Sequence, residues 1–206
     1  MPKDPSAPLR RLGVMGGTFD PIHVGHLVIA SEALYELDLD RMMFTPTGQP
    51  WQKKLYSDSE DRYMMTVLGA GGNPRFTVSR MELDRVGPTY TADTMEALKE
   101  FHGPEVELFF VAGADAALRL GTWKGIERLV DLAEVVAVAR PGHDLGDFKP
   151  EVGWPRVRVM KTPGLDISST DIRERVREGR PIDYLVPAPV ARFIRERGLY
   201  MEMETG

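Results

Sequence analysis

Cysteine is absent from the 206 residues of this sequence, and histidine occurs only four times. The lack of cysteine excludes disulfide bonds, thiolate zinc sites and cysteine nucleophiles, and it is typical of proteins made in a reducing compartment. With so few histidines, a zinc site also has few imidazole ligands to draw on. A functional site in this protein is therefore expected to use oxygen and nitrogen groups, and no structural metal is expected.

Long hydrophobic runs are also missing. The most apolar stretches, VELFFVAG and EVVAVA, have the length of a strand and fall far short of the ~20 residues that span a bilayer. The opening MPKDPSAPLRR is positively charged but has no apolar run behind it, so it does not resemble a secretory signal. These observations predict a cytoplasmic protein with no membrane partner.

An excess of positive charge is absent too, because the formal net charge is −5. Nucleic-acid backbones are normally bound by clustered Lys and Arg, so a broad nucleic-acid surface is disfavoured, whereas a local site for a small anion is not. Hydrophobic residues make up 42% of the chain and charged residues 28%, as in average globular proteins. We expect one domain over residues 1–206, with flexible tails at 1–10 and 201–206.

Apolar runs with strand character alternate with helical patterns along the chain. Such alternation requires crossover connections, which predicts an α/β fold with a Rossmann-like, doubly wound parallel sheet and C-terminal helices. The predicted strands cover residues 12–15, 42–45, 76–79, 106–111, 135–139 and 157–160. The predicted helices cover residues 25–36, 59–68, 93–102, 125–132, 169–178 and 189–197.

Local signals predict where two of these segments begin or end. Asp93 followed three residues later by Glu96 is typical of a capping box, which predicts a helix start at this point. Gly103, standing before a proline, is expected to end the same helix. The segment 140–155 is rich in proline and glycine and is predicted to be a surface loop.

The segment GVMGGTFDPIHVGHLVIASEAL runs from an apolar strand through a Gly-Gly turn into an amphipathic helix. In a parallel sheet this places Gly16 and Gly17 at the carboxyl end of a strand, where such folds bind ligands. Glycines let a phosphate approach the backbone, and the helix behind them directs N–H groups and its positive end toward it. For a glycine pair alone, a tight turn without a ligand is the alternative.

Two histidines, His23 and His26, bracket Gly25 at the predicted start of that helix, where both rings could face one bound anion. Imidazoles can donate hydrogen bonds to oxygens that gain charge in a transition state. Metal ligation and a purely structural role for the rings stay open as alternatives, although the lack of further ligands disfavours zinc.

A second polar segment, ISSTDIR, precedes a helical pattern near the other end of the chain. Ser168 and Ser169 supply hydroxyls and backbone donors at a helix start, and Arg173 follows one turn later on the same face. We expect this helix to close at Gly179. The arrangement suits a triphosphate, but a simple N-cap followed by a solvated arginine is the alternative.

Taken together, these strings resemble the signatures of a known family. GGTFDPIHVGH is similar over eleven consecutive positions to the HxGH motif of a nucleotidyltransferase superfamily, and its GGTFDP opening most resembles nicotinate mononucleotide adenylyltransferases. ISSTDIR resembles the second motif of that superfamily, and VPAPVARFIRERGLY resembles the family's C-terminal helix. The resemblance runs from residue 12 to about residue 200 in the family's order and implies its Rossmann-like fold.

The resemblance implies an ATP site built from both motifs. His23 and His26 would contact the phosphates and stabilise the transition state, together with Arg173. PTGQPWQK, residues 46–53, resembles a loop that brings a lysine to the phosphates, a role that falls on Lys53. The other residues that the resemblance assigns to ATP binding are Gly16, Gly17, Thr18, Phe19, Gly113, Asp115, Ile167, Ser168 and Ser169.

Four further strings, GPTYTADT, GAD, GTWKG and ARPG, resemble family motifs for the acceptor end of the site. The resemblance implies that Trp123 stacks on a nicotinate ring and that Thr91 and the backbone of Lys124 meet its carboxylate. Arg140 would contact the acceptor phosphate. Lys124 replaces an aromatic residue that is common in the family, which affects side-chain packing but leaves the backbone N–H in place.

The implied reaction transfers the adenylyl group of ATP to nicotinate mononucleotide in NAD biosynthesis, with Mg²⁺ bridging the triphosphate. A pantetheine-phosphate adenylyltransferase and a non-catalytic nucleotide-binding module are the alternatives. A Rossmann oxidoreductase is disfavoured because no GxGxxG follows the first strand. The implied partners are thus ATP and a mononucleotide, and a homo-oligomer is left open.

Overall fold

The computed structural model describes residues 4, 8–49, 55–139 and 157–201. Its centre is a six-stranded sheet in the order β3-β2-β1-β4-β5-β6, and every neighbouring pair is parallel. The strands are β1 (Arg11–Gly17), β2 (Arg41–Pro46), β3 (Phe76–Val78), β4 (Glu107–Gly113), β5 (Glu134–Ala139) and β6 (Val157–Lys161). The predicted Rossmann-like α/β class is confirmed, and each predicted strand overlaps an observed one.

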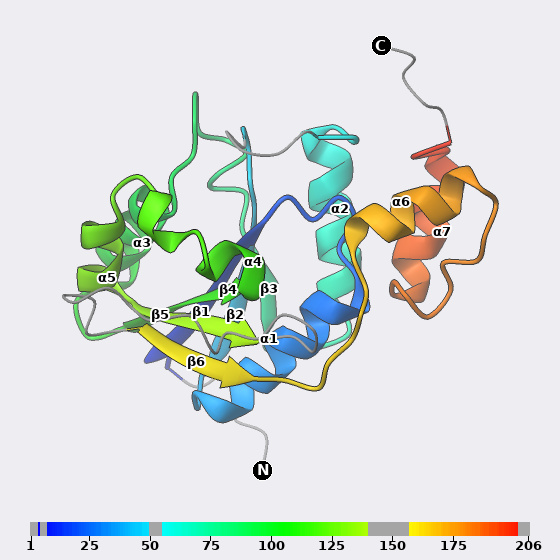
Figure 1. The fold of residues 1–206 in the computed structure, drawn as a ribbon. Coiled ribbons are helices and arrows are strands. Elements are labelled where there is room, and N and C mark those ends of the chain that lie inside the picture. The colour runs from blue at the N-terminus through cyan, green and yellow to red at the C-terminus, as the bar shows by residue number, and fades with distance from the viewer. Residues whose placement is uncertain (1–3, 5–7, 50–54, 140–156, 202–206) are drawn as a thin grey trace.

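Helices connect the strands and cover both faces of the sheet (Figure 1). They are α1 (Val24–Glu36), α2 (Ser59–Ala70), α3 (Thr91–His102), α4 (Ala114–Ala117), the 3-10 helix η1 (Leu120–Thr122), α5 (Ile126–Leu132), α6 (Ser169–Arg177) and α7 (Ala188–Arg197). The six predicted helices are all present. The short α4 and η1 were not predicted, because segments of three or four residues are too short to show a helical period.

The two faces of the sheet carry separate apolar clusters, as alternation along the strands requires. In β4, Phe109 and Val111 join a cluster that includes residues of α1, α2, α6 and α7. Phe110 and Ala112, between and beyond them, join a second cluster with residues of α3 and α5. Because both faces are covered, β4 is buried along most of its length and reads as the continuous apolar run ELFFVAG.

The start of α3 differs from the capping-box prediction. The helix begins at Thr91, and its N-cap is Tyr90, which makes no side-chain capping bond. Asp93 lies inside the first turn, and its carboxylate pairs with Arg128 of α5 at 2.6 Å, while Glu96 pairs with the same guanidinium at 2.8 Å. The two acidic residues therefore tie α3 to α5 instead of capping α3.

Other predicted boundaries are confirmed by the backbone. Gly103 ends α3 with φ 87°, and Gly179 follows α6 with φ 68°, a region in which glycine pays no steric penalty. Ser168 is the N-cap of α6, where its hydroxyl oxygen accepts a hydrogen bond from the N–H of Asp171 at 3.1 Å. The predicted loop at 140–155 lies outside the described residues.

The strand order fixes where a ligand can bind. The chain moves from β1 outward through β2 to β3 and then returns to place β4 on the other side of β1. The connections leaving β1 and β4 therefore diverge to opposite sides, and a crevice opens at the carboxyl ends of these two strands. Gly16 and Gly17 lie at this point, but the predicted Gly-Gly turn is wrong, because both glycines are still part of β1 and pair with Thr45 and Pro46 of β2.

Candidate active site

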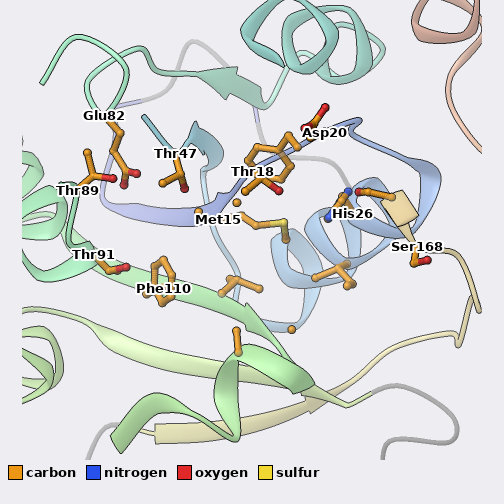
Figure 2. A pocket seen from close by; sticks show the side chains of 18 of the residues that line it. Met15, Thr18, Asp20, His26, Thr47, Glu82, Thr89, Thr91, Phe110 and Ser168 are labelled. Atoms are coloured by element: carbon orange, nitrogen blue, oxygen red, sulfur yellow. The ribbon is translucent and has the colours of Figure 1, made fainter. Parts of the chain in front are cut away.

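A cavity of about 580 Å³ opens at the carboxyl ends of β1 and β4. This volume falls within the range of small-molecule sites. Figure 2 shows that Glu82, Thr89, Thr91 and Phe110 lie at one end and His26 and Ser168 at the other, with Thr18 and Thr47 between them. The residues predicted from sequence that line it are Gly16, Gly17, Thr18, Phe19, His23, His26, Thr91, Gly113, Trp123, Lys124, Ser168, Ser169 and Arg173.

The turn after β1 places the aromatic ring of Phe19 in the lining of the cavity. Phe19 has a positive φ of 48° and is almost completely buried. Its ring meets His26 edge-on at 5.1 Å and Phe44 at 5.7 Å. A Cβ on Gly17 would come within 3.0 Å of the Phe19 ring, so the second glycine makes room for this ring to fold back.

The two histidines contact each other at the start of α1. His23 is the N-cap, and its backbone N–H donates to Nδ1 of His26 at 3.2 Å. The rings stack with centroids 3.7 Å apart. A Cβ on Gly25 would lie 3.0 Å from Nδ1 of His23, so a residue with a side chain would displace the first ring. This explains the glycine between the histidines.

The backbone contact also decides the protonation pattern of His26. Because Nδ1 accepts a hydrogen bond, the proton of the neutral ring sits on Nε2. His26 is half-buried and lines the cavity. The fold thus supplies a ring that can donate through Nε2, the chemistry needed to stabilise an oxygen that gains negative charge.

The second motif is joined to the first by direct hydrogen bonds. Nη1 of Arg173 donates to the backbone carbonyl of Asp20 at 2.7 Å, and the hydroxyl of Ser169 donates to the carbonyl of Pro21 at 2.9 Å. The guanidinium also lies over the ring of Tyr56 at 4.0 Å, a cation–π contact. Segments almost 150 residues apart in the chain therefore form one wall of the cavity.

Asp20 connects this wall to two further segments, a role the sequence analysis did not assign. One carboxylate oxygen accepts from the N–H groups of Tyr56 and Ser57 at 2.7 and 3.2 Å, and the other accepts from the hydroxyl of Tyr200 at 2.7 Å. Burial and the Asp20 charge raise the pKa of Tyr200, so its hydroxyl stays a donor. Asp20 stands inside the GGTFDP string, but its three donors follow from the fold alone.

Arg62 of α2 is a second residue that sequence reasoning missed. The side chain is fully buried, and it donates to the carbonyls of Thr18 at 2.9 Å, Thr47 at 2.7 Å and Gly48 at 3.4 Å. Burial lowers the pKa of the guanidinium. Arg62 thereby fastens the loops after β1 and β2 together. The sequence feature that could have identified Arg62 as a buried residue is its position one turn before Met65, on the side of α2 that faces the core.

The opposite end of the cavity is built from a helix start and aromatic rings. Thr91 is the first residue of α3, where N–H groups lack partners within the helix and the helix dipole is positive. Trp123 meets Phe110 edge-on at 5.7 Å and remains half-buried. Nζ of Lys124 lies over the ring of Tyr90 at 4.8 Å, so this lysine packs on an aromatic face although it is not aromatic itself.

Four predicted residues are not placed in the cavity by the structure. Ile167 does not line it, because the side chain packs against the apolar cluster that includes α1 and α6. Asp115 falls in α4, and its side chain lies outside the described residues. Lys53 and Arg140 also lie outside the described residues.

The described part of the chain contains no group of three or more His, Asp or Glu side chains arranged to hold a metal ion. Within the same residues, no helix is both long and apolar enough to cross a bilayer.

Sequence comparison finds extensive relatives. A sequence model described as cytidylyltransferase-like matches residues 14–175. The chain is 54% identical over 198 residues to a probable nicotinate-nucleotide adenylyltransferase of Clavibacter michiganensis, covering 95% of this chain and 96% of the relative. It is 50% identical to the protein of the same description from Corynebacterium glutamicum, covering 92% of this chain and 88% of the relative.

Structure comparison finds the same architecture. Plasmodium falciparum nicotinic acid mononucleotide adenylyltransferase complexed with NaAD matches with a TM-score of 0.73 and 20% identity, covering 93% of this chain and 97% of the other. A putative nicotinate-nucleotide adenylyltransferase from Vibrio parahaemolyticus matches with a TM-score of 0.70 and 18% identity, covering 95% and 98%. At these identities the likeness establishes the fold.

Proposed function

The chain belongs to the cytidylyltransferase-like family and, within it, to the nicotinate-nucleotide adenylyltransferases, and on this premise we propose how its cavity performs adenylyl transfer. ATP and nicotinate mononucleotide are the substrates, and nicotinate adenine dinucleotide and pyrophosphate are the products. The main support for the proposal is the hydrogen bond from Arg173 to the carbonyl of Asp20, because it joins the two proposed phosphate-binding motifs in one wall of the cavity.

The reaction is an in-line displacement. An oxygen of the acceptor's 5′-phosphate attacks the α-phosphorus of ATP, the bond to the bridging oxygen breaks, and pyrophosphate leaves with the electron pair. The acceptor phosphate is already largely ionised near neutral pH, so no strong general base is needed. Catalysis then depends on positioning and on stabilising charge that develops on phosphate oxygens.

The ATP end of the cavity supplies that stabilisation. His26 donates through Nε2, a tautomer held by the backbone of His23. Arg173 presents a guanidinium held in place by Asp20 and Tyr56. We assign the triphosphate to these residues, with Ser168 and Ser169 at the positive end of α6. Lys53 is proposed as a further phosphate ligand on the strength of the resemblance alone.

The acceptor end supplies recognition of the pyridine nucleotide. Trp123 offers a flat face for the ring, and the N–H groups at the start of α3, beginning at Thr91, suit a carboxylate. The backbone N–H of Lys124 is the second proposed donor to that carboxylate. Arg140 is proposed to bind the acceptor phosphate, again from the resemblance.

Mg²⁺ is proposed to enter with ATP as part of the substrate. Among the described residues that line the cavity, the two carboxylates are Asp20 and Glu82. The oxygens of Asp20 already accept three hydrogen bonds from the protein, which leaves little capacity for a metal. A cation held mainly by triphosphate oxygens and water fits this lining, in keeping with the usual behaviour of Mg²⁺ in such sites.

One assay tests the proposed function. Purified protein is incubated with ATP, Mg²⁺ and one of three acceptors, namely nicotinate mononucleotide, nicotinamide mononucleotide or phosphopantetheine, while pyrophosphate release is followed. We expect the fastest release with nicotinate mononucleotide. Release only with phosphopantetheine, or with none of the three, would overturn the assignment.

A further inference from the structure

Glu82 is a buried carboxyl group that the proposed mechanism does not use. Glu82 is only 5% exposed, yet it lines the cavity. Figure 2 shows its side chain pointing into the cavity between Thr47 and Thr89, at the same end as Thr91. A carboxyl group in this position faces the end of the cavity to which we assign the pyridine ring and its substituent.

The surroundings of Glu82 supply one well-formed hydrogen bond and one nearby cation. The hydroxyl of Thr94, in the first turn of α3, donates to Oε1 at 2.9 Å, and Nη1 of Arg85 lies 3.4 Å from the same hydroxyl. Burial raises the pKa of Glu82, while Thr94, the charge of Arg85 and the hydroxyls of Thr89 and Thr47 oppose that shift. Burial thus disfavours the charged form of Glu82, and its polar neighbours favour it.

Other charged side chains around this end belong to different elements. Lys124 and Arg119 line the same cavity, and Lys124 is directed to the ring of Tyr90. Arg62 of α2 lies behind Gly48, whose backbone packs directly against the carbonyl of Glu82. Arg85 is a further cation, and its charge lowers the pKa of Glu82.

On the premise of the proposed function, we propose that binding of the acidic acceptor is coupled to the uptake of one proton from solvent by Glu82. The substrate carboxylate at the start of α3 brings a second negative charge into a buried space that already holds the carboxyl of Glu82. Two such groups at one site do not both remain ionised without a large energetic penalty. In the bound state Glu82 therefore carries the proton, with Oε1 still able to accept from Thr94.

The coupling has a definite sign. The bound acceptor raises the pKa of Glu82 above its value in the empty site, so affinity for the acidic acceptor is greatest at low pH and falls as pH rises between the two values. Within this window the dissociation constant rises about tenfold for each pH unit. An acceptor that carries a carboxamide brings no charge to this end, and its affinity shows no such loss.

The experiment measures acceptor binding to the full chain from about pH 5.5 to about pH 8.5, which lies above the ordinary glutamate pKa of about 4.3. Nicotinamide mononucleotide is the internal control, because it shares the titrating phosphate and the ring but lacks the carboxylate. We expect the acid-to-amide affinity ratio to fall at least tenfold across the range. Calorimetry in two buffers of different ionisation enthalpy should show uptake of up to one extra proton for the acid.

Variants identify the group responsible. Glu82→Gln keeps a carbonyl that can accept from Thr94 but cannot ionise, so the ratio should become independent of pH and the extra proton uptake should disappear. Asp84→Asn removes the same charge from an exposed neighbour that pairs with Arg80, and it should behave as wild type. A wild-type ratio that does not change with pH, or a Glu82→Gln variant that keeps the full slope, would overturn the proposal.

These outcomes are separable from the proposed function. Pyrophosphate release reports whether adenylyl transfer occurs, whatever the pH dependence of binding. If binding without ATP is too weak to measure, kcat/KM for the two acceptors at saturating ATP gives the same ratio. The wild-type calorimetry needs no variant, so a Glu82→Gln protein that fails to fold would not prevent the test.

Discussion

The two ends of the cavity are held in place by different means. At the end that we assign to ATP, polar side chains that line the cavity are held by backbone groups, as His26 is by the N–H of His23 and Arg173 by the carbonyl of Asp20. At the end that we assign to the acceptor, an aromatic ring and the start of a helix line the cavity, as Trp123 and Thr91 do. The first arrangement suits charge that develops during reaction, and the second suits a ligand that must be recognised before reaction.

This difference predicts that substitutions at the ATP end act on turnover. His26→Ala should lower kcat by about 10²–10³, the usual effect of losing one donor to a transition-state oxygen, with little change in KM for the acceptor. His102→Ala, on α3 outside the cavity, serves as the control for loss of an imidazole. Steady-state kinetics give both constants. If kcat for His26→Ala stays within about threefold of wild type, the ring has no catalytic role.

The geometry of the guanidinium, and not only its charge, should matter. Arg173→Lys keeps the positive charge but loses the planar set of donors that reaches Asp20 and Thr170, so we expect affinity for ATP to fall by about tenfold while the fold survives. Arg175→Lys, in the same helix, is the matched control because Arg175 pairs with Asp171. Calorimetric titration with ATP decides. Equal affinities for the two variants would make Arg173 an ordinary surface charge.

The acceptor end should respond in KM, and the effect on selectivity should be small. Trp123→Ala removes a stacking face that is indifferent to the ring substituent, so kcat/KM should fall by about tenfold for both nicotinate and nicotinamide mononucleotide. The preference for the acid, which we attribute to N–H donors near Thr91, should persist in the variant. Tyr35→Ala, an exposed aromatic on α1, provides the control. Equal efficiencies for the two acceptors in the wild type would refute carboxylate recognition.

The smallest expected effect lies outside the cavity. Tyr200→Phe deletes one donor to the buried carboxylate of Asp20, which retains the N–H groups of Tyr56 and Ser57. We expect a loss of about 1–2 kcal/mol in the free energy of unfolding, with kcat within about threefold of wild type. Urea denaturation measures the first and the pyrophosphate assay the second. Unchanged stability would show that the hydroxyl is not a supporting contact.

Much of the fold could be predicted from hydrophobic periodicity and from glycines at helix ends. The six strands and six longer helices were visible as alternating apolar patterns, and Gly103 and Gly179 marked helix ends because their backbones adopt positive φ. The capping-box prediction at Asp93 failed because α3 begins two residues earlier, at Thr91, so that Asp93 lies in the first turn and its carboxylate pairs with Arg128. Local sequence cannot distinguish a capping carboxylate from one that pairs with another helix.

The candidate site was predictable to the extent that it resides in contiguous motifs. The glycines, His23, His26 and Arg173 could be named from their strings, and they do line one cavity. Asp20, Arg62 and Glu82 could not be given roles, because their partners are backbone groups and hydroxyls supplied by segments elsewhere in the chain. A buried charged residue needs polar partners, but the sequence does not show which groups these are; the fold does.

The separation of the two ends along the chain has a consequence for how such a protein can diversify. The end that we assign to ATP is lined by residues from the segments 16–26 and 168–173, whereas the end that we assign to the acceptor is lined by Glu82 and by residues from the segments 89–91 and 119–124. Substitutions confined to the acceptor segments can therefore change the acceptor while the residues for adenylyl transfer are kept. The strand order allows this, since the segments belong to connections leaving different strands. A scaffold of this kind can acquire new acceptors without reinventing its chemistry.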